Sequence, residues 1–108
     1  MAKPPSSAAR DRVRETVPKL IDVTEKTLFG DIWERKELSK RDRSLITVAA
    51  LVTGGNVEQL TFHLQFAKDN GVTEEELIEA ITHLAFYAGW PAAMTAANVA
   101  REVFAEEE

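Results

Sequence analysis

Cysteine is absent from this sequence of 108 residues, and its absence excludes several classes of chemistry. Without a thiol, the chain forms no disulfide, no thiolate metal site and no cysteine nucleophile. Long hydrophobic runs are also missing, because the longest nearly apolar stretch, Leu45 to Val52, is far shorter than the roughly 20 residues of a membrane-spanning helix. The first ten residues are polar and lack the apolar segment of a secretory signal. We therefore expect no membrane partner and a cytoplasmic location.

Basic charge is scarce. The chain has 13 Lys and Arg against 18 Asp and Glu, a formal net charge of −5, and the cations are not massed on one predicted face. Because binding to a phosphate backbone needs such a basic footprint, we expect no nucleic acid partner. The proportions of apolar residues (44%) and charged residues (29%) are ordinary for a folded protein, and the length suits one domain.

The N-terminal part of the chain offers little to bury. Residues 1–15 carry two prolines, two serines and then alternating charges, which predicts a flexible arm, with a domain over 16–108. Pro18 suits the first turn of a helix, and Gly30 stands where a left-handed residue ends one. The following segment, Asp31 to Leu38, is predicted to connect two helices and to place the side chain of Trp33 in the interior.

The rest of the chain shows repeated helix starts and stops. Capping patterns precede apolar stripes of helical spacing, glycines follow them, and Pro91 opens the last helix. The patterns are Ser39 with Asp42, Asn56 with Gln59 and Thr73 with Glu76; the glycines are Gly54-Gly55, Gly71 and Gly89. One helix is predicted over about 40–53. Without any hairpin signal, these features predict an all-α bundle of about five helices.

Apolar residues exceed what a small monomer can bury. The helix over 40–53 is apolar nearly all round, and the next helix carries a second apolar edge, Phe62 and Phe66. A five-helix monomer has little interior in which to hide helices from every side. We therefore expect a homo-oligomer.

The two histidines, His63 and His83, both fall on predicted apolar stripes. An imidazole in such surroundings is desolvated and can transfer a proton near neutral pH, although a histidine satisfied by one hydrogen bond in the core is the common alternative. For His63 the neighbours favour function: Gln59 lies one turn earlier, where it could orient the ring, and Glu58 lies in the first turn of the same helix. For His83 we favour the structural alternative, a histidine satisfied by one hydrogen bond.

Besides His83, four further residues are candidates for substrate binding. Arg41 and Arg43 flank Asp42 at a helix start, where positive charge opposes the helix dipole, so they call for an ion pair or a carboxylate ligand. Tyr87 and Trp90, around Gly89, could line a pocket or simply pack. No metal-ligand spacing, phosphate loop or serine triad is present, so we expect no metal.

Taken together and in order, several segments resemble the carboxymuconolactone decarboxylase family. These segments are Leu38 to Leu51, Glu58-Gln59-Leu60, Phe62-His63-Leu64, Asn70 to Thr73, Glu76-Leu77 and Tyr87 to Ala93. The likeness covers about residues 18–104. It implies an all-α fold shared with the alkylhydroperoxidase proteins, and a trimer or a hexamer built from dimers.

The resemblance also indicates which branch of the family applies. Members of the redox branch carry a Cys-x-x-Cys pair, a histidine and an upstream glutamate, and these positions fall here on Asn56, Gln59, His63 and Ser44. Without sulfur, peroxide reduction by the chain's own thiols is excluded. The decarboxylase branch also lacks the cysteine pair and keeps the histidine.

The resemblance implies decarboxylation of a small carboxylated lactone such as 4-carboxymuconolactone, in aromatic compound catabolism and without a cofactor. On this hypothesis His63 transfers the proton, and Glu58 or Gln59 orients the imidazole of His63. Either Arg41 or Arg43 binds the substrate carboxylate. A non-catalytic oligomeric binding or scaffold protein with the same fold is the alternative.

Overall fold

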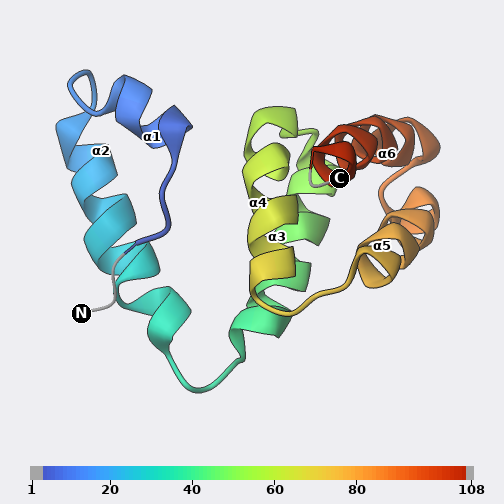
Figure 1. Cartoon of the computed structure of the whole chain (residues 1–108), viewed down its shortest axis with the longest axis horizontal. Coiled ribbons are helices and arrows are strands. Elements are labelled where there is room, and N and C mark those ends of the chain that lie inside the picture. Colours follow the sequence, from blue (N-terminus) through green and yellow to red (C-terminus); the bar gives the residue numbers. More distant parts are fainter. Residues whose placement is uncertain (1–3, 107–108) are drawn as a thin grey trace. The chain divides into compact units, whose positions relative to one another are not determined.

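The computed structural model describes residues 4–106, and within that range it is helical with no β-strand (Figure 1). This confirms the predicted all-α class. The chain divides into two compact units, with the boundary between Lys40 and Arg41. No helix in the described range is both long enough and apolar enough to cross a membrane.

The first unit is built from four short helical elements around a small core. They are α1 (Ala8–Val13), α2 (Pro18–Val23), the π-helix η1 (Thr24–Phe29) and the 3₁₀-helix η2 (Ile32–Glu34). Pro18 occupies the first turn of α2, as predicted. Phe29 and Trp33 are buried, with ring centroids 6.0 Å apart, so the expected inward placement of Trp33 is confirmed.

Helix α1 lies within the segment that we expected to be a flexible arm. The side chain of Ser7 accepts a hydrogen bond from the backbone N–H of Arg10 and caps the helix. Glu25 then pairs with Arg10 at 3.3 Å and with Arg14 at 2.6 Å. Because the acid lies 15 residues after Arg10 and 11 after Arg14, the local pattern of alternating charges does not reveal these contacts.

Gly30 does not adopt the left-handed conformation that we predicted for it. Its φ is −80°, and the chain reaches it through the π-helix η1. A β-carbon at this position would lie 2.5 Å from the carbonyl oxygen of Lys26. The glycine is therefore required by the close approach of backbone from the preceding turn, and not by a positive φ.

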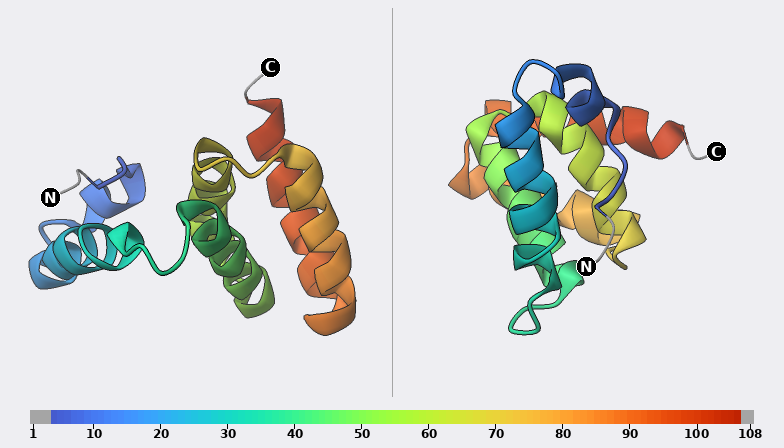
Figure 2. Two further views of the ribbon diagram at one scale, coloured as in Figure 1. Left: turned by 90° about the horizontal axis from the view of Figure 1, so that it is seen from below. Right: turned by 90° about the vertical axis from the view of Figure 1, so that its left-hand side faces the viewer.

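The second unit holds four longer helices. They are α3 (Lys40–Gly54), α4 (Val57–Asp69), α5 (Glu74–Tyr87) and α6 (Trp90–Ala105). α6 packs against both α4 and α5, and Figure 2 shows α5 and α6 as an antiparallel pair joined by a tight turn. The core of this unit contains fully buried side chains from α3, α4 and α5, including Val48, Leu64 and Leu77.

Two helix ends of the second unit follow the predicted signals, and one does not. Thr73 and Glu76 form a complete capping box at the start of α5. Gly89 takes a φ of 108° between α5 and α6, where Pro91 follows in the first turn. The predicted cap at Asn56 was wrong, because its side chain makes no capping bond to α4.

Candidate functional site

His63 lies on α4 beside two aromatic rings of the same helix, which also contact each other with centroids 5.5 Å apart. Its ring centroid is 4.9 Å from that of Phe62 and 6.0 Å from that of Phe66, both in edge-on geometry. The imidazole is half-buried, and its Nδ1 atom is shielded from solvent. The structure therefore gives His63 a partly desolvated, aromatic setting of the kind in which an imidazole can act in proton transfer.

Glu58 and Gln59, the predicted partners of His63, lie in the first turn of α4 with exposed side chains. Gln59 is one helical turn from His63, but its side chain makes no hydrogen bond within residues 4–106. The orienting role of these two residues therefore stays a prediction.

Arg41 is held by acids. It forms an ion pair with Glu76 at the start of α5 and a second with Asp42 at 3.4 Å. An ion pair, one of the two explanations offered for these arginines, is thus observed for Arg41. Arg43, on the same helical turn, is half-buried.

The pKa of the Glu76 carboxyl is lowered below its usual value. The main cause is a hydrogen bond from the backbone N–H of Thr73, and the charge of Arg41 and the Thr73 hydroxyl add to it. Partial desolvation acts in the opposite direction. Glu76 therefore remains ionised and fixes Arg41 beside it.

An open groove with a volume of about 410 Å³ lies between α3 and α5. Its lining residues are Leu45, Ala49, Glu76, Glu79, Ala80, His83 and Leu84. His83 is exposed on this groove and stacks on Tyr87 with ring centroids 4.9 Å apart. The two histidines thus occupy different settings, since His63 is not among the residues of the groove.

Tyr87 and Trp90 lie on the surface at the junction of α5 and α6. The exposed fractions of their side chains are 78% and 60%. Both were candidates for lining a pocket, and the structure shows them open to solvent on the face that also carries Phe86.

Sequence reasoning did not anticipate a buried polar contact between α3 and the end of α4. The side-chain amide of Asn70 donates a hydrogen bond of 3.0 Å to the hydroxyl of Ser44, which is fully buried. The sequence offers one signal, since a serine in the middle of an apolar stripe needs a polar partner.

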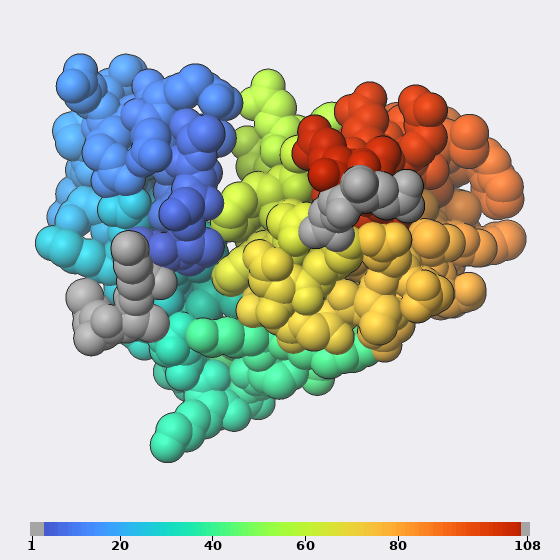
Figure 3. Space-filling model, viewed as in Figure 1, coloured from blue at the N-terminus to red at the C-terminus, as the bar shows by residue number. Residues whose placement is uncertain are grey.

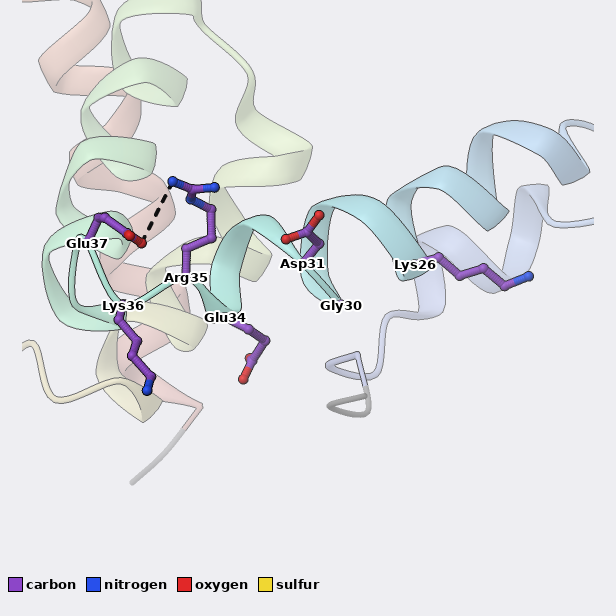
Figure 4. A pocket seen from close by; sticks show the side chains of 7 residues that line it. All are labelled: Lys26, Gly30, Asp31, Glu34, Arg35, Lys36 and Glu37. Atoms are coloured by element: carbon purple, nitrogen blue, oxygen red, sulfur yellow. Dashed lines mark ion pairs between the residues drawn. The ribbon is translucent and has the colours of Figure 1, made fainter.

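A second, charged depression lies in the first unit, with a volume of about 510 Å³ (Figure 4). Several of its side chains form ion pairs: Arg35 with Glu37 at 3.7 Å, and Glu34 with Lys40 at 2.7 Å. Lys26 points away from the others in this view. Among the described residues, no group of three or more His, Asp or Glu side chains is arranged to hold a metal ion.

Comparison with known proteins gives two relatives with named activities and one uncharacterised relative. A 4-carboxymuconolactone decarboxylase of Acinetobacter baylyi is 43% identical over 76 residues, covering 70% of this chain and 57% of the relative. A nitrosuccinic acid decarboxylase of Metarhizium robertsii is 35% identical over 74 residues, covering 68% and 52%. An uncharacterised 15.0 kDa protein of Paracoccus denitrificans is 32% identical over 82 residues, covering 74% and 61%.

The chain spans between half and two thirds of the length of these relatives. The sequence profile of the carboxymuconolactone decarboxylase family matches residues 18–102, which include the half-buried histidine of α4 and all four helices of the second unit up to the last turn of α6. The chain therefore belongs to the carboxymuconolactone decarboxylase family.

Proposed function

We propose that this protein decarboxylates a small carboxylic acid whose leaving carboxylate is attached to an activated carbon, with His63 as the proton donor. The observation that carries the proposal is the half-buried imidazole that contacts both Phe62 and Phe66 on α4. The 43% identity to a 4-carboxymuconolactone decarboxylase supports the reaction class.

The compounds named for two relatives share one chemical feature. In 4-carboxymuconolactone the electrons left by carbon dioxide pass through the ring double bond to the lactone carbonyl, and in nitrosuccinic acid they pass into the nitro group. Each compound also keeps a second carboxylate after the first is lost. We therefore expect a dicarboxylate with a built-in electron acceptor, and among such substrates a lactone from aromatic compound catabolism is our first choice.

The reaction divides into two steps. The bond between the carboxylate carbon and the activated carbon breaks, carbon dioxide leaves, and the electron pair moves onto the carbonyl or nitro oxygen. Protonated His63 then delivers its proton to the carbanion and recovers a proton from solvent. Because the electron acceptor belongs to the substrate, this sequence requires no bound electron sink.

The remaining roles are orientation and binding. A cation in the first turn of α3, Arg41 or Arg43, holds the carboxylate that stays. Since Glu76 already pairs with Arg41, binding at that residue requires exchange of one carboxylate for another. Phe62 and Phe66 limit water around His63, which strengthens its electrostatic interaction with the developing negative charge.

The direct test is turnover of 4-carboxymuconolactone and nitrosuccinic acid, followed as release of carbon dioxide. General acid catalysis contributes about a hundredfold or more, so His63→Ala and His63→Gln should lower kcat by at least about that factor. Thr61→Ala is the matched control, because Thr61 lies on the same helix with an exposed side chain. It should leave kcat unchanged.

Two results would argue against the proposal in different ways. Equal rates for the wild type and His63→Ala would remove His63 from the mechanism while leaving the decarboxylase activity. Failure of the folded wild type to turn over either compound or related lactones would favour the alternative, an oligomeric binding or scaffold protein of this fold.

A further inference from the structure

Asn70 caps the end of α4 and is followed directly by Gly71. In such a pair the backbone nitrogen of the glycine can attack the side-chain carbonyl carbon of the asparagine, because glycine has no β-carbon to obstruct the approach. The other two asparagines of the chain, Asn56 and Asn98, each precede a valine, whose branched side chain crowds the backbone nitrogen. Asn70 is therefore the asparagine that is open to this reaction.

The turn after α4 requires both residues of the pair. Gly71 has a φ of 98°, a left-handed conformation that favours glycine. The side-chain amide of Asn70 donates a hydrogen bond of 3.0 Å to the buried hydroxyl of Ser44 on α3. A different residue at either position would strain the turn or remove the contact with α3. The reactive pair is thus a consequence of how α4 ends.

The folded turn keeps the reacting atoms apart. The backbone N–H of Gly71 donates to the carbonyl of Lys68 at 3.0 Å. The backbone N–H of Val72 donates to the carbonyl of Ala67 at 2.9 Å, which completes a Schellman motif. The ψ of Asn70 is 8°, so the nitrogen of Gly71 lies beside the backbone nitrogen of Asn70 and away from its β-carbon. Ring closure needs that nitrogen beside the β-carbon, so the turn must first open.

Opening this turn is a larger event than the rotation of a side chain. Val72 is only 2% exposed and belongs to the core of the second unit. Rotation about the Cα–C bond of Asn70 breaks the two Schellman bonds and releases the end of α4. The segment that joins α4 to α5, yellow in Figure 3, lies at the surface, so water reaches the backbone once the turn opens.

We propose that Asn70-Gly71 is a modification site at which the chain converts itself, without an enzyme, when the end of α4 opens. The backbone nitrogen of Gly71 loses its proton to solvent and forms a bond to Cγ of Asn70. The bond between Cγ and Nδ2 breaks, and this nitrogen takes up a proton and leaves as ammonia. Water then opens the cyclic imide at either carbonyl, which gives aspartate or isoaspartate. Loss of ammonia makes the conversion one-way.

Neither product rebuilds the native turn. Isoaspartate carries the main chain through the former side chain, which adds a carbon atom before Gly71 and moves the Schellman bonds out of register. Aspartate lacks the N–H group that donates to Ser44. It also places a negative charge at the C-terminal end of α4, next to Asp69, where the helix dipole opposes it. Conversion therefore records past openings of the turn and leaves a less stable second unit.

This inference is independent of the proposed function, and mass spectrometry of peptides tests it. The wild type is incubated at slightly alkaline pH in buffer and in urea, and labelling by an isoaspartate methyltransferase identifies isoaspartate. In urea, Asn70 should convert at least about tenfold faster than Asn56 and Asn98, because valine hinders the attack at these two positions. In buffer, Asn70 should convert at least about tenfold more slowly than in urea, because only the open fraction reacts.

A pair of variants tests the role of the contact with α3. Ser44→Ala should speed conversion of Asn70 in buffer at least about fivefold and leave the rate in urea unchanged. Val52→Ala is the control, because it removes a buried side chain of the same helix without removing the hydrogen bond. When urea is added so that both variants have the same free energy of unfolding, Ser44→Ala should still convert faster.

Three results would overturn the inference. The first is conversion of Asn70 in urea no faster than that of Asn56 and Asn98, and the second is an equal rate in buffer and in urea. The third is a Ser44→Ala variant that converts no faster than Val52→Ala at matched stability. The first two use only the wild type, so they decide the matter even where a variant does not fold.

Discussion

The amide nitrogen of Asn70, at the end of α4, lies 3.0 Å from the hydroxyl oxygen of Ser44, which is buried in α3. This hydrogen bond joins two helices of the second unit. Ser44→Ala leaves a half-buried amide donor without this acceptor, so we expect a loss of about 1–3 kcal/mol in the free energy of unfolding.

Urea denaturation measures this loss. Thr53→Ala is the control, because it removes a hydroxyl of the same helix that is exposed and bonded only to the carbonyl of Ala49. A double-mutant cycle with Asn70→Ala should show a coupling between Ser44 and Asn70. Equal stability of Ser44→Ala and the wild type would contradict the importance of the contact.

The capping box of α5 makes the stability of the second unit sensitive to acid. The pKa of Glu76 is lowered in the folded protein, chiefly by the backbone N–H of Thr73. Its contribution to stability is therefore complete above about pH 4.3, the ordinary pKa of glutamate, and is lost as the pH falls through the lowered value. Denaturation of Glu76→Gln and the wild type should differ at neutral pH and converge in strong acid. A constant difference across this range would exclude the linkage.

Helix α1 depends on one acid. Glu25 pairs with both Arg10 and Arg14, and Arg14 is the main cause of the lowered pKa of Glu25. Glu25→Gln should increase hydrogen exchange of the α1 amides about two- to fivefold, a modest change because solvent still reaches these ion pairs, above all at Arg14. Glu15→Gln is the control, since Glu15 forms no ion pair in the described structure. Faster exchange in both variants would contradict a specific role for Glu25.

Phe66 should influence activity through His63, which it contacts edge-on at a centroid distance of 6.0 Å. If the proposed function holds, Phe66→Ala frees the imidazole to move and lowers kcat about tenfold or more, with a smaller effect on KM. Phe66→Leu restores bulk and should recover part of the loss. Gln65→Ala, at the neighbouring position, is the control. Unchanged kcat in Phe66→Ala would mean that the ring does not position His63.

The helices of the second unit could be predicted because their start and stop signals are local. Thr73 and Glu76 are three residues apart, and Pro91 lies two residues after Gly89, so the capping box and the last helix are encoded in short segments. The π-helix Thr24–Phe29 and helix α1 could not be predicted in this way. The first has no short signature, and the second rests on contacts with Glu25.

The site was predictable to a similar degree. The sequence pattern indicated that His63 has apolar neighbours, and the structure shows which rings these are. The same pattern placed His83 on an apolar stripe, but whether a stripe is covered depends on the packing of other helices. In the structure His83 and Tyr87 are exposed.

The two tryptophans report on different halves of the molecule. Trp33 is buried in the first unit, whereas Trp90 is mostly exposed in the second. Unfolding should therefore move the emission of Trp33 to longer wavelength and change that of Trp90 little. Burial of Trp90 by a bound molecule should instead move the emission of Trp90 to shorter wavelength. With one tryptophan replaced by phenylalanine at a time, intrinsic fluorescence can follow each unit separately without an added dye.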